Sequence, residues 1–173
     1  RALLRSRFHE ERMFALLVAV RQYQQGELKA RDSIFRFYLA HTRYINNWDL
    51  VDLSAPLIVG PHVFGGDGAL LRRLGRSKLL WERRIAVLAS FYFIRKGRFG
   101  ETLWLARLLL GDGEDLMHKA VGWMLREMGK RDSEALRAFL AKHGPRMPRT
   151  MLRYAIERFP AAERGRWLKD TKT

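Results

Sequence analysis

Apolar side chains recur along this chain at spacings of three and four residues, which is the period of one face of an α-helix. Such stripes run through residues 14–25, 34–38 and 80–91. No segment alternates apolar and polar residues between hairpin turns, as a half-buried strand would. The pattern predicts an all-α protein of about nine helices with no sheet.

Glycine and proline divide the chain into pieces of helix length, and each is expected to end or begin a helix. They stand at Gly26, Gly60–Pro61, Gly65–Gly68, Gly97, Gly111–Gly113, Gly144–Pro145, Pro148 and Pro160. The residues from Ser133 to Leu136 are typical of a helix start, and Pro148 is placed for a first helical turn.

Several amphipathic segments resemble one another at a regular interval. Arg12, Trp48 and Arg84 lie 36 residues apart, Lys119 follows 35 residues later, and a similar segment surrounds Thr150. Repeats of this length built from helix pairs are typical of α-solenoids. The expected architecture is therefore an α-solenoid of HEAT-like helical repeats, in which one helix of each pair lines a concave face.

Composition narrows the class of protein. The chain of 173 residues is 47% hydrophobic, enough for one domain with a substantial core. Its longest uninterrupted apolar run, residues 13–20, is far shorter than a membrane span of about 20 residues. The absence of cysteine excludes disulfides, thiolate zinc sites and cysteine nucleophiles. With no signal-peptide pattern at its start, the protein is expected in the cytoplasm, associated with the nucleoid.

Charge indicates the kind of partner. Thirty-three Lys and Arg residues against 18 Asp and Glu give a net charge of +15. A field of this sign attracts polyanions, nucleic acid first and an anionic membrane surface second. A concave face lined by basic residues of successive repeats could then form a track for phosphates. Its candidates are Lys78, Arg83, Arg84, Lys119, Arg126, Lys130, Arg131 and Arg149.

The segment Asn46–Asp52 carries the most suggestive polar residues. An asparagine at its start caps a helix, and if that residue is Asn46, Asp49 completes a capping box. Asp52 lies beyond the first turn, where capping no longer explains a carboxylate, and shares a helix face with Trp48. Asp52 is either a functional carboxylate beside an aromatic ring or the partner of one of the many arginines.

Other candidate chemistry is limited. Trp48 and Trp123 lie early in repeat helices with basic neighbours, where their rings could contact sugars and bases, whereas Trp81 and Trp104 are expected in the core. The five histidines show no metal-ligand spacing, so neither a metal site nor a cofactor is predicted.

Four stretches taken together resemble a known family. They are YINNWDLVDLSAPLIVG (44–60), SKLLWERRIAVLASFYFIRKG (77–97), DLMHKAVGWMLREMGKRD (115–132) and MPRTMLRYAIERFP (147–160). In this order they resemble the AlkD-type DNA alkylation repair glycosylases, which are built from HEAT-like repeats. Members of that family carry further helices before the point where this sequence begins. The expected organisation is thus a single HEAT-like repeat domain, 1–173, without those N-terminal helices.

The resemblance implies a function and assigns residues to it. The implied activity is a DNA glycosylase that excises cationic alkylated purines, such as 3-methyladenine and 7-methylguanine, from duplex DNA. Trp48 and Asp52 match the family's catalytic aromatic residue and carboxylate, and Trp123 matches its second active-site tryptophan. Arg84 and Arg126 match arginines that contact the DNA backbone.

Two other function classes stay open. One is a non-catalytic helical-repeat protein that binds DNA, in which Asp52 serves only as an ion-pair partner. The other is a protein-binding scaffold whose basic face docks on an acidic partner. The glycosylase hypothesis predicts a monomer that acts on duplex DNA containing alkylated bases, without an obligate protein partner and without contact to a membrane.

Overall fold

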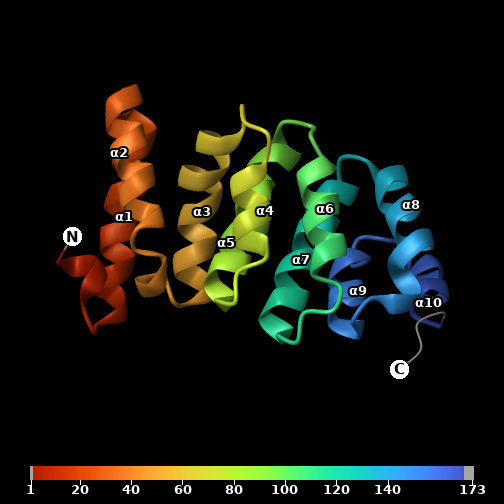
Figure 1. The fold of residues 1–173 in the computed structure, drawn as a ribbon. Helices are drawn as coiled ribbons and strands as arrows, with labels where there is room; N and C mark the ends of the chain where they lie inside the picture. The colour runs from red at the N-terminus through yellow and green to blue at the C-terminus, as the bar shows by residue number, and fades with distance from the viewer. Residues whose placement is uncertain (1, 170–173) are drawn as a thin grey trace. The chain divides into compact units, whose positions relative to one another are not determined.

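The computed structural model describes residues 2–169, and within that range the chain is all-helical and contains no strand (Figure 1). The all-α class expected from the sequence is confirmed, with ten α-helices in this range where about nine were expected. They are α1 (His9–Gln25), α2 (Leu28–Leu39), α3 (Trp48–Val63), α4 (Ala69–Gly75), α5 (Leu80–Arg95), α6 (Gly100–Leu108), α7 (Asp115–Gly129), α8 (Ser133–His143), α9 (Arg149–Ala155) and α10 (Ala161–Lys169).

Most of the expected breakers end or begin these helices. Gly26 closes α1, where its N–H donates to the carbonyl of Gln22 at 2.8 Å. Gly68, before α4, and Gly97, after α5, adopt φ values of 76° and 74°. This left-handed conformation is strained for residues that carry a Cβ atom, so glycine suits both turns.

Gly60–Pro61 does not break a helix, so the expectation at this position is wrong. Both residues lie inside α3, which also contains Pro56 and continues to Val63. A proline removes one backbone donor and usually disrupts a helix interior. Here Pro61 stands in the last turn of a helix whose middle is buried, from Ser54 to Gly60 on its packed side. Tertiary packing outweighs the local preference.

Contacts divide the chain into two compact units, Arg1–Tyr92 and Phe93–Thr173, with α5 beginning in the first and ending in the second. In the first unit α1 packs against both α2 and α3 (Figure 1). Its core includes the fully buried Leu50, Ile58 and Tyr38. The Tyr38 hydroxyl is not left unpaired, because it forms a hydrogen bond of 2.9 Å with the Ser54 hydroxyl.

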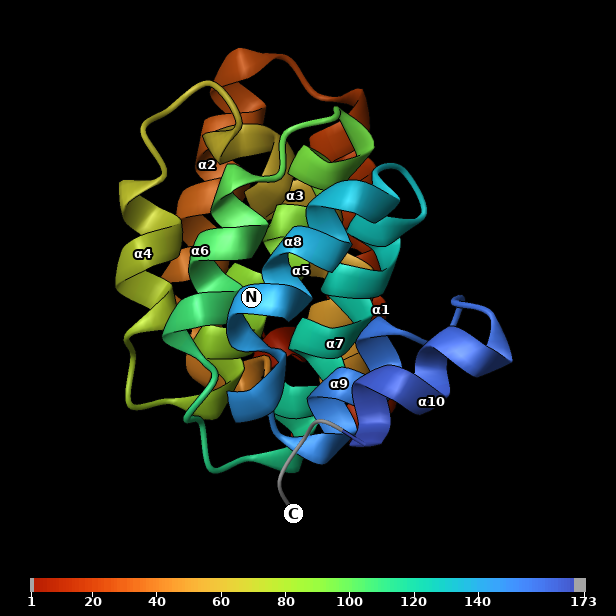
Figure 2. The same cartoon turned by 90° about the vertical axis from the view of Figure 1, so that its right-hand side faces the viewer.

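The second unit is centred on α7. This helix packs most extensively against α9 and also against α6 and α8 (Figure 2). Its buried side includes Met117, Met124 and Leu125, which contribute to the core with Met151 and Leu152 of α9. The unit has its own hydrophobic core.

The same device brings two helices together in each unit. A Cβ atom on Gly60 of α3 would lie 2.6 Å from the Ala89 carbonyl oxygen of α5. A Cβ atom on Gly122 of α7 would lie 2.5 Å from the Met151 carbonyl oxygen of α9. Both distances are far below ordinary contact, so each crossing requires glycine.

The segments that resemble one another fall on alternate helices. Arg12 lies on α1, Trp48 on α3, Arg84 on α5, Lys119 on α7 and Thr150 on α9. The even-numbered helices lie between them in the chain. This order agrees with a repeat made of one helix pair.

Candidate functional site

Asn47, and not Asn46, caps the helix that carries Trp48 and Asp52. Its side-chain oxygen accepts the Trp48 N–H at 2.8 Å, so α3 begins at Trp48. Asp49 is therefore the second helical residue and forms no capping box. One of its carboxylate oxygens accepts the Leu50 N–H, and the other lies 2.7 Å from Nε2 of His9 on α1. These contacts fasten the start of α3 to α1.

Trp48 and Asp52 lie one turn apart on α3. Trp48 is 52% exposed, which is unusual for a tryptophan and leaves much of its ring open to contact. Asp52 is mostly enclosed, with 16% of its side chain exposed. An exposed tryptophan is therefore one helical turn away from a carboxylate of which only a small part reaches the surface.

Arg84 of α5 binds the carboxylate of Asp52 through two hydrogen bonds. Arg84 Nε donates to one carboxylate oxygen at 2.9 Å and Nη2 donates to the other at 2.8 Å. The guanidinium fork matches the carboxylate geometry, so the pair fixes the orientation of Asp52. The arginine is 5% exposed, whereas the sequence alone predicted a contact with the DNA backbone. Its role toward DNA stays a prediction.

Burial controls the ionisation of Asp52. Loss of hydration raises the pKa of Asp52 above the ordinary aspartate value. The hydrogen bonds and positive charge of Arg84 oppose this rise without cancelling it, and the nearby negative charge of Asp49 adds to it. Asp52 thus combines a fixed orientation with a destabilised negative charge, which is a favourable combination for interaction with a cation.

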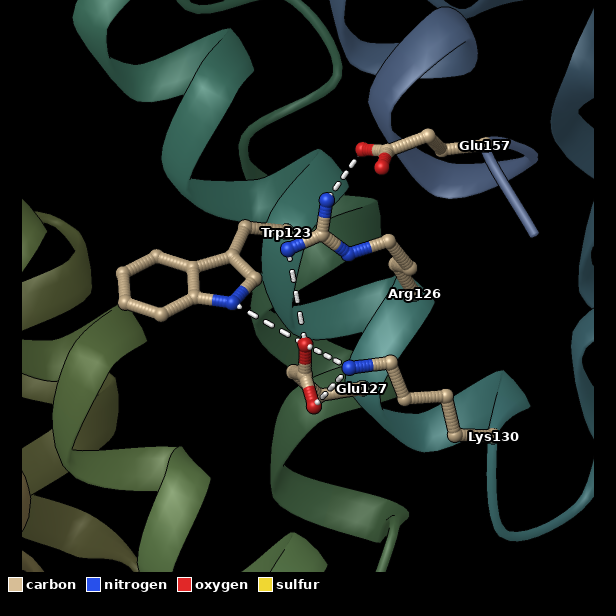
Figure 3. Close-up of polar contacts among 5 residues, drawn as sticks. All are labelled: Trp123, Arg126, Glu127, Lys130 and Glu157. Carbon is tan, nitrogen blue, oxygen red and sulfur yellow. Dashed lines mark hydrogen bonds and ion pairs between the residues drawn. The ribbon is translucent and has the colours of Figure 1, made fainter.

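The second unit places Trp123 and Arg126 in one polar cluster on α7 (Figure 3). The indole N–H of Trp123 donates to Oε1 of Glu127 at 3.2 Å. Arg126 forms an ion pair with Glu157, beyond the end of α9, and its second nitrogen lies 3.5 Å from Glu127. Lys130 Nζ lies 2.7 and 2.9 Å from the two Glu127 oxygens. The sequence analysis named Trp123, Arg126 and Lys130 and missed Glu127, the carboxylate at the centre of this cluster.

Glu127 is ionised in this cluster. Burial disfavours its charge, but hydrogen bonds from Lys130 and Trp123 and the charge of Arg126 outweigh that effect. The pKa of Glu127 consequently lies below the ordinary glutamate value. The spacing of Trp123, Glu127 and Lys130 on one helical face is a signal that the sequence offered.

Many cations of the expected phosphate track have partners within the protein. Arg83 donates to the carbonyls of Ser77 and Lys78, and Arg149 donates to the carbonyl of Leu168. Lys119 Nζ lies 2.7 Å from an oxygen of Asp115. These contacts hold helix ends and neighbouring turns together, so net charge alone overstates the number of available cations.

The remaining tryptophan predictions are only partly met. Trp81 and Trp104 are half-buried, although the sequence places them in the core. Trp123 is also half-buried. The aromatic residues at helix surfaces here are amphipathic, with one part of the ring packed and another exposed.

Between residues 2 and 169, no three or more His, Asp or Glu side chains are grouped so that they could hold a metal ion. No helix in the same range has the length and apolar character needed to cross a membrane.

The fold and the site define an all-α protein with a strong positive charge, an exposed tryptophan and a carboxylate fixed by arginine. The chain belongs to the DNA alkylation repair enzyme family, whose sequence profile matches residues 1–159. This family assigns the protein a role in the repair of alkylated DNA and confirms the resemblance found in the sequence. Neither a curated protein nor a solved structure matches the chain.

Proposed function

We propose that this protein is a DNA glycosylase that removes cationic alkylated purines, including 3-methyladenine and 7-methylguanine, from duplex DNA. The observation that carries the proposal is the placement of Asp52. Its carboxylate is held in one orientation by Arg84, is largely removed from water, and lies one turn from the exposed ring of Trp48.

The reaction needs little acid catalysis. Alkylation at N3 or N7 gives the base a positive charge, and the electron pair of the N-glycosidic bond neutralises it as the base leaves. Positive charge then develops on the deoxyribose, at C1′ and the ring oxygen. Water adds its oxygen to C1′ and gives up a proton, so that the products are a neutral purine and an abasic sugar.

Asp52 supplies what this transition state requires. A fixed negative charge next to the developing sugar cation stabilises it, and the same oxygens can orient the attacking water. Because Arg84 already holds the carboxylate, little reorganisation is needed during the reaction. The residual lone pairs of the carboxylate face the substrate in this proposal.

Trp48 and Trp123 contact the deoxyribose and the damaged nucleotide in the proposal. The negative face of an indole attracts a cation, so an aromatic ring stabilises the charged base and the developing sugar cation alike. The 52% exposure of Trp48 supports this role. Trp123, in the second unit, keeps the role that the family resemblance assigns to it, with Glu127 holding its indole N–H.

In the same proposal the protein acts as a monomer and binds the DNA backbone. Arg84 and Arg126 are the residues that contact the backbone. The net charge of +15 supports affinity for duplex DNA. HEAT-like stacking with a concave basic face is part of the same proposal. The placement of the five similar segments on α1, α3, α5, α7 and α9 supports it.

One observation favours a second candidate, a non-catalytic helical-repeat DNA-binding protein. Each carboxylate oxygen of Asp52 accepts a hydrogen bond from a nearly buried arginine, as in a structural ion pair. The deciding experiment is single-turnover release of 7-methylguanine from methylated duplex DNA. Release by the parent and its loss in Asp52→Asn support the glycosylase, and an inactive parent that binds DNA well supports the second candidate.

A further inference from the structure

An open cavity of about 440 Å³ lies between α7 and α9 in the second unit. It falls within the range of about 300–1,000 Å³ occupied by small-molecule sites. Its walls are polar and come from the two helices and the turn after α9. They consist of Asp115, Lys119, Thr150, Arg153, Tyr154 and Glu157.

The two carboxylates of this cavity are already satisfied. Asp115 forms an ion pair of 2.7 Å with Lys119 and accepts a hydrogen bond from Thr150, and its pKa is lowered as a result. Glu157 is paired with Arg126 (Figure 3). Neither acid therefore needs a cation from outside.

The polar groups of Arg153 and Tyr154 have no partner of this kind within residues 2–169. The Arg153 side chain is exposed and forms no hydrogen bond or ion pair within residues 2–169. Tyr154 is 36% exposed, and its hydroxyl has no hydrogen-bond partner within the same range. A guanidinium and a phenol ring thus stand side by side at the cavity with their binding capacity unused.

The lining residues carry two positive and two negative charges. Lys119 pairs with Asp115, and Glu157 pairs with Arg126 from outside the lining, so Arg153 is the lining cation whose charge no paired carboxylate offsets within residues 2–169. A guanidinium binds the oxygens of a phosphate with two parallel hydrogen bonds. An adjacent aromatic face suits a sugar or a base, because every base offers a π-face for stacking.

We propose that the cavity between α7 and α9 binds one nucleotide of the DNA backbone, with Arg153 on the phosphate and the Tyr154 ring against the adjoining sugar or base. Lys119 adds a donor at the opposite wall, because its ammonium group has three N–H donors and one contact to Asp115 does not use them all. The inference rests on the proposed function in that duplex DNA is the partner. It adds a contact that neither the family resemblance nor the sequence pattern assigned.

Binding to undamaged duplex DNA tests this site separately from catalysis. Fluorescence anisotropy of a labelled duplex, titrated at several salt concentrations, gives both the affinity and its salt dependence. Arg153→Gln is expected to weaken binding about tenfold and to reduce the log–log salt slope by about 0.9, the effect of one lost phosphate contact. Arg158→Gln is the matched control, because Arg158 is also exposed, is five residues away and lies outside the cavity lining.

Two further variants test the details. Tyr154→Leu is expected to weaken binding at least fivefold, and Tyr154→Phe is expected to retain it, because stacking needs the ring and not the hydroxyl. Glu157→Gln is expected to tighten binding, since it removes a negative charge from the cavity and releases Arg126. Circular dichroism establishes that each variant is folded.

The outcomes separate the proposals. Equal weakening by Arg153→Gln and Arg158→Gln, or an unchanged salt slope in Arg153→Gln, overturns the site. Competition by inorganic phosphate alone at low millimolar concentration also overturns it, in favour of a free-anion site. If the parent releases no methylated base but shows the Arg153 dependence, the glycosylase proposal fails and this site stands.

Discussion

Asp52 and Arg84 are separated by 32 residues in the sequence and are joined by two hydrogen bonds of 2.9 and 2.8 Å between α3 and α5. The arginine is the more deeply buried of the two, with 6% of its side chain exposed against 16% for the carboxylate. The guanidinium of Arg84 is therefore fixed inside the protein, and the carboxylate that it binds reaches the surface. It makes Arg84 a positioning residue for Asp52 in the proposed reaction.

Asp52→Asn is expected to reduce excision of 7-methylguanine by about 10²–10³-fold, which is typical for loss of one preorganised electrostatic group. The amide keeps the shape of the side chain and removes its charge. DNA binding is expected to persist or to tighten, because a negative charge near phosphates is lost. Single-turnover release and anisotropy on the same duplex measure the two effects.

The control for that variant is Asp49→Asn, three residues earlier on the same helix. Its contacts are to His9 and to the Leu50 N–H, and both are structural. It is expected to lower the free energy of unfolding by about 1 kcal/mol or less and to excise at close to the parental rate. Excision at the parental rate by Asp52→Asn would reduce Asp52 to an ion-pair partner.

The pH dependence of excision should report the raised pKa of Asp52. Because the active form is the carboxylate, the rate is expected to rise with pH through a pKa above the ordinary aspartate value of about 3.9. Arg84→Gln removes the hydrogen bonds and charge that oppose the effect of burial, so the acid limb moves to higher pH. Single-turnover rates of the parent and of Arg84→Gln are measured across the acid range. A rise of the rate that occurs at lower pH in Arg84→Gln than in the parent contradicts this account.

The same shift has a consequence for stability. A carboxyl group whose pKa is raised by folding contributes stability below its unfolded pKa, and this contribution is lost as pH rises through the folded value. Arg84 limits that loss in the parent. Removal of Arg84 is therefore expected to cost more at neutral pH than at acidic pH, and chemical denaturation of Arg84→Gln at two pH values measures the difference.

Local sequence patterns predicted the positions of the helices well, but they did not predict which helices pack against one another. The spacing of apolar residues and the terminal glycines depend on nearby positions, so Gly26 and Gly97 were identified as helix ends. Gly60 looks the same in the sequence, but it lies inside α3 because α5 crosses there. That crossing is a tertiary contact, which periodicity does not contain.

In the candidate site too, relations within one helix could be predicted and contacts between helices could not. Trp48 and Asp52 share a helix, so their common face followed from a spacing of four residues. The partner of Asp52 depends on how α3 meets α5, and the sequence offered many arginines as equivalent choices. The sequence did not indicate that Arg84, for which a contact with DNA stays a prediction, binds Asp52. Glu127 is within one turn of Trp123 and was in principle accessible to the same reasoning.

The two glycine crossings predict a matched pair of stability effects. Gly60→Ala and Gly122→Ala each place a methyl group within 2.7 Å of a backbone oxygen and a Cβ atom on the facing helix. Each variant is expected to lose about 1–3 kcal/mol of unfolding free energy, as overpacked sites do. For a chain of this size that corresponds to a fall in Tm of about 2–4 °C per kcal/mol.

Gly113→Ala is the control for the crossings, because a Cβ atom there meets nothing within 4 Å. It is expected to be neutral or slightly stabilising, since alanine restricts the unfolded chain more than glycine does. Thermal unfolding of the three variants compares the positions directly. Equal Tm values for Gly122→Ala and Gly113→Ala would contradict the close approach of α7 and α9.

The hydrogen bond between Trp123 and Glu127 predicts a coupling that a double-mutant cycle can measure. Glu127→Ala removes the acceptor of the indole N–H and leaves Arg126 and Lys130 with less compensation. In the proposed function Glu127→Ala is expected to lower the excision rate about tenfold, because the indole ring of Trp123 is then no longer held in place. Glu127→Gln keeps an acceptor oxygen and is expected to retain part of the lost rate. In a Trp123→Phe background the indole N–H is absent, so Glu127→Ala should add little further loss.

The indole N–H signal of Trp123, identified by its disappearance in Trp123→Phe, gives an independent measurement by nuclear magnetic resonance. It is expected to exchange faster with solvent in Glu127→Ala, and additive effects on the rate combined with an unchanged indole signal would show that Glu127 does not hold Trp123.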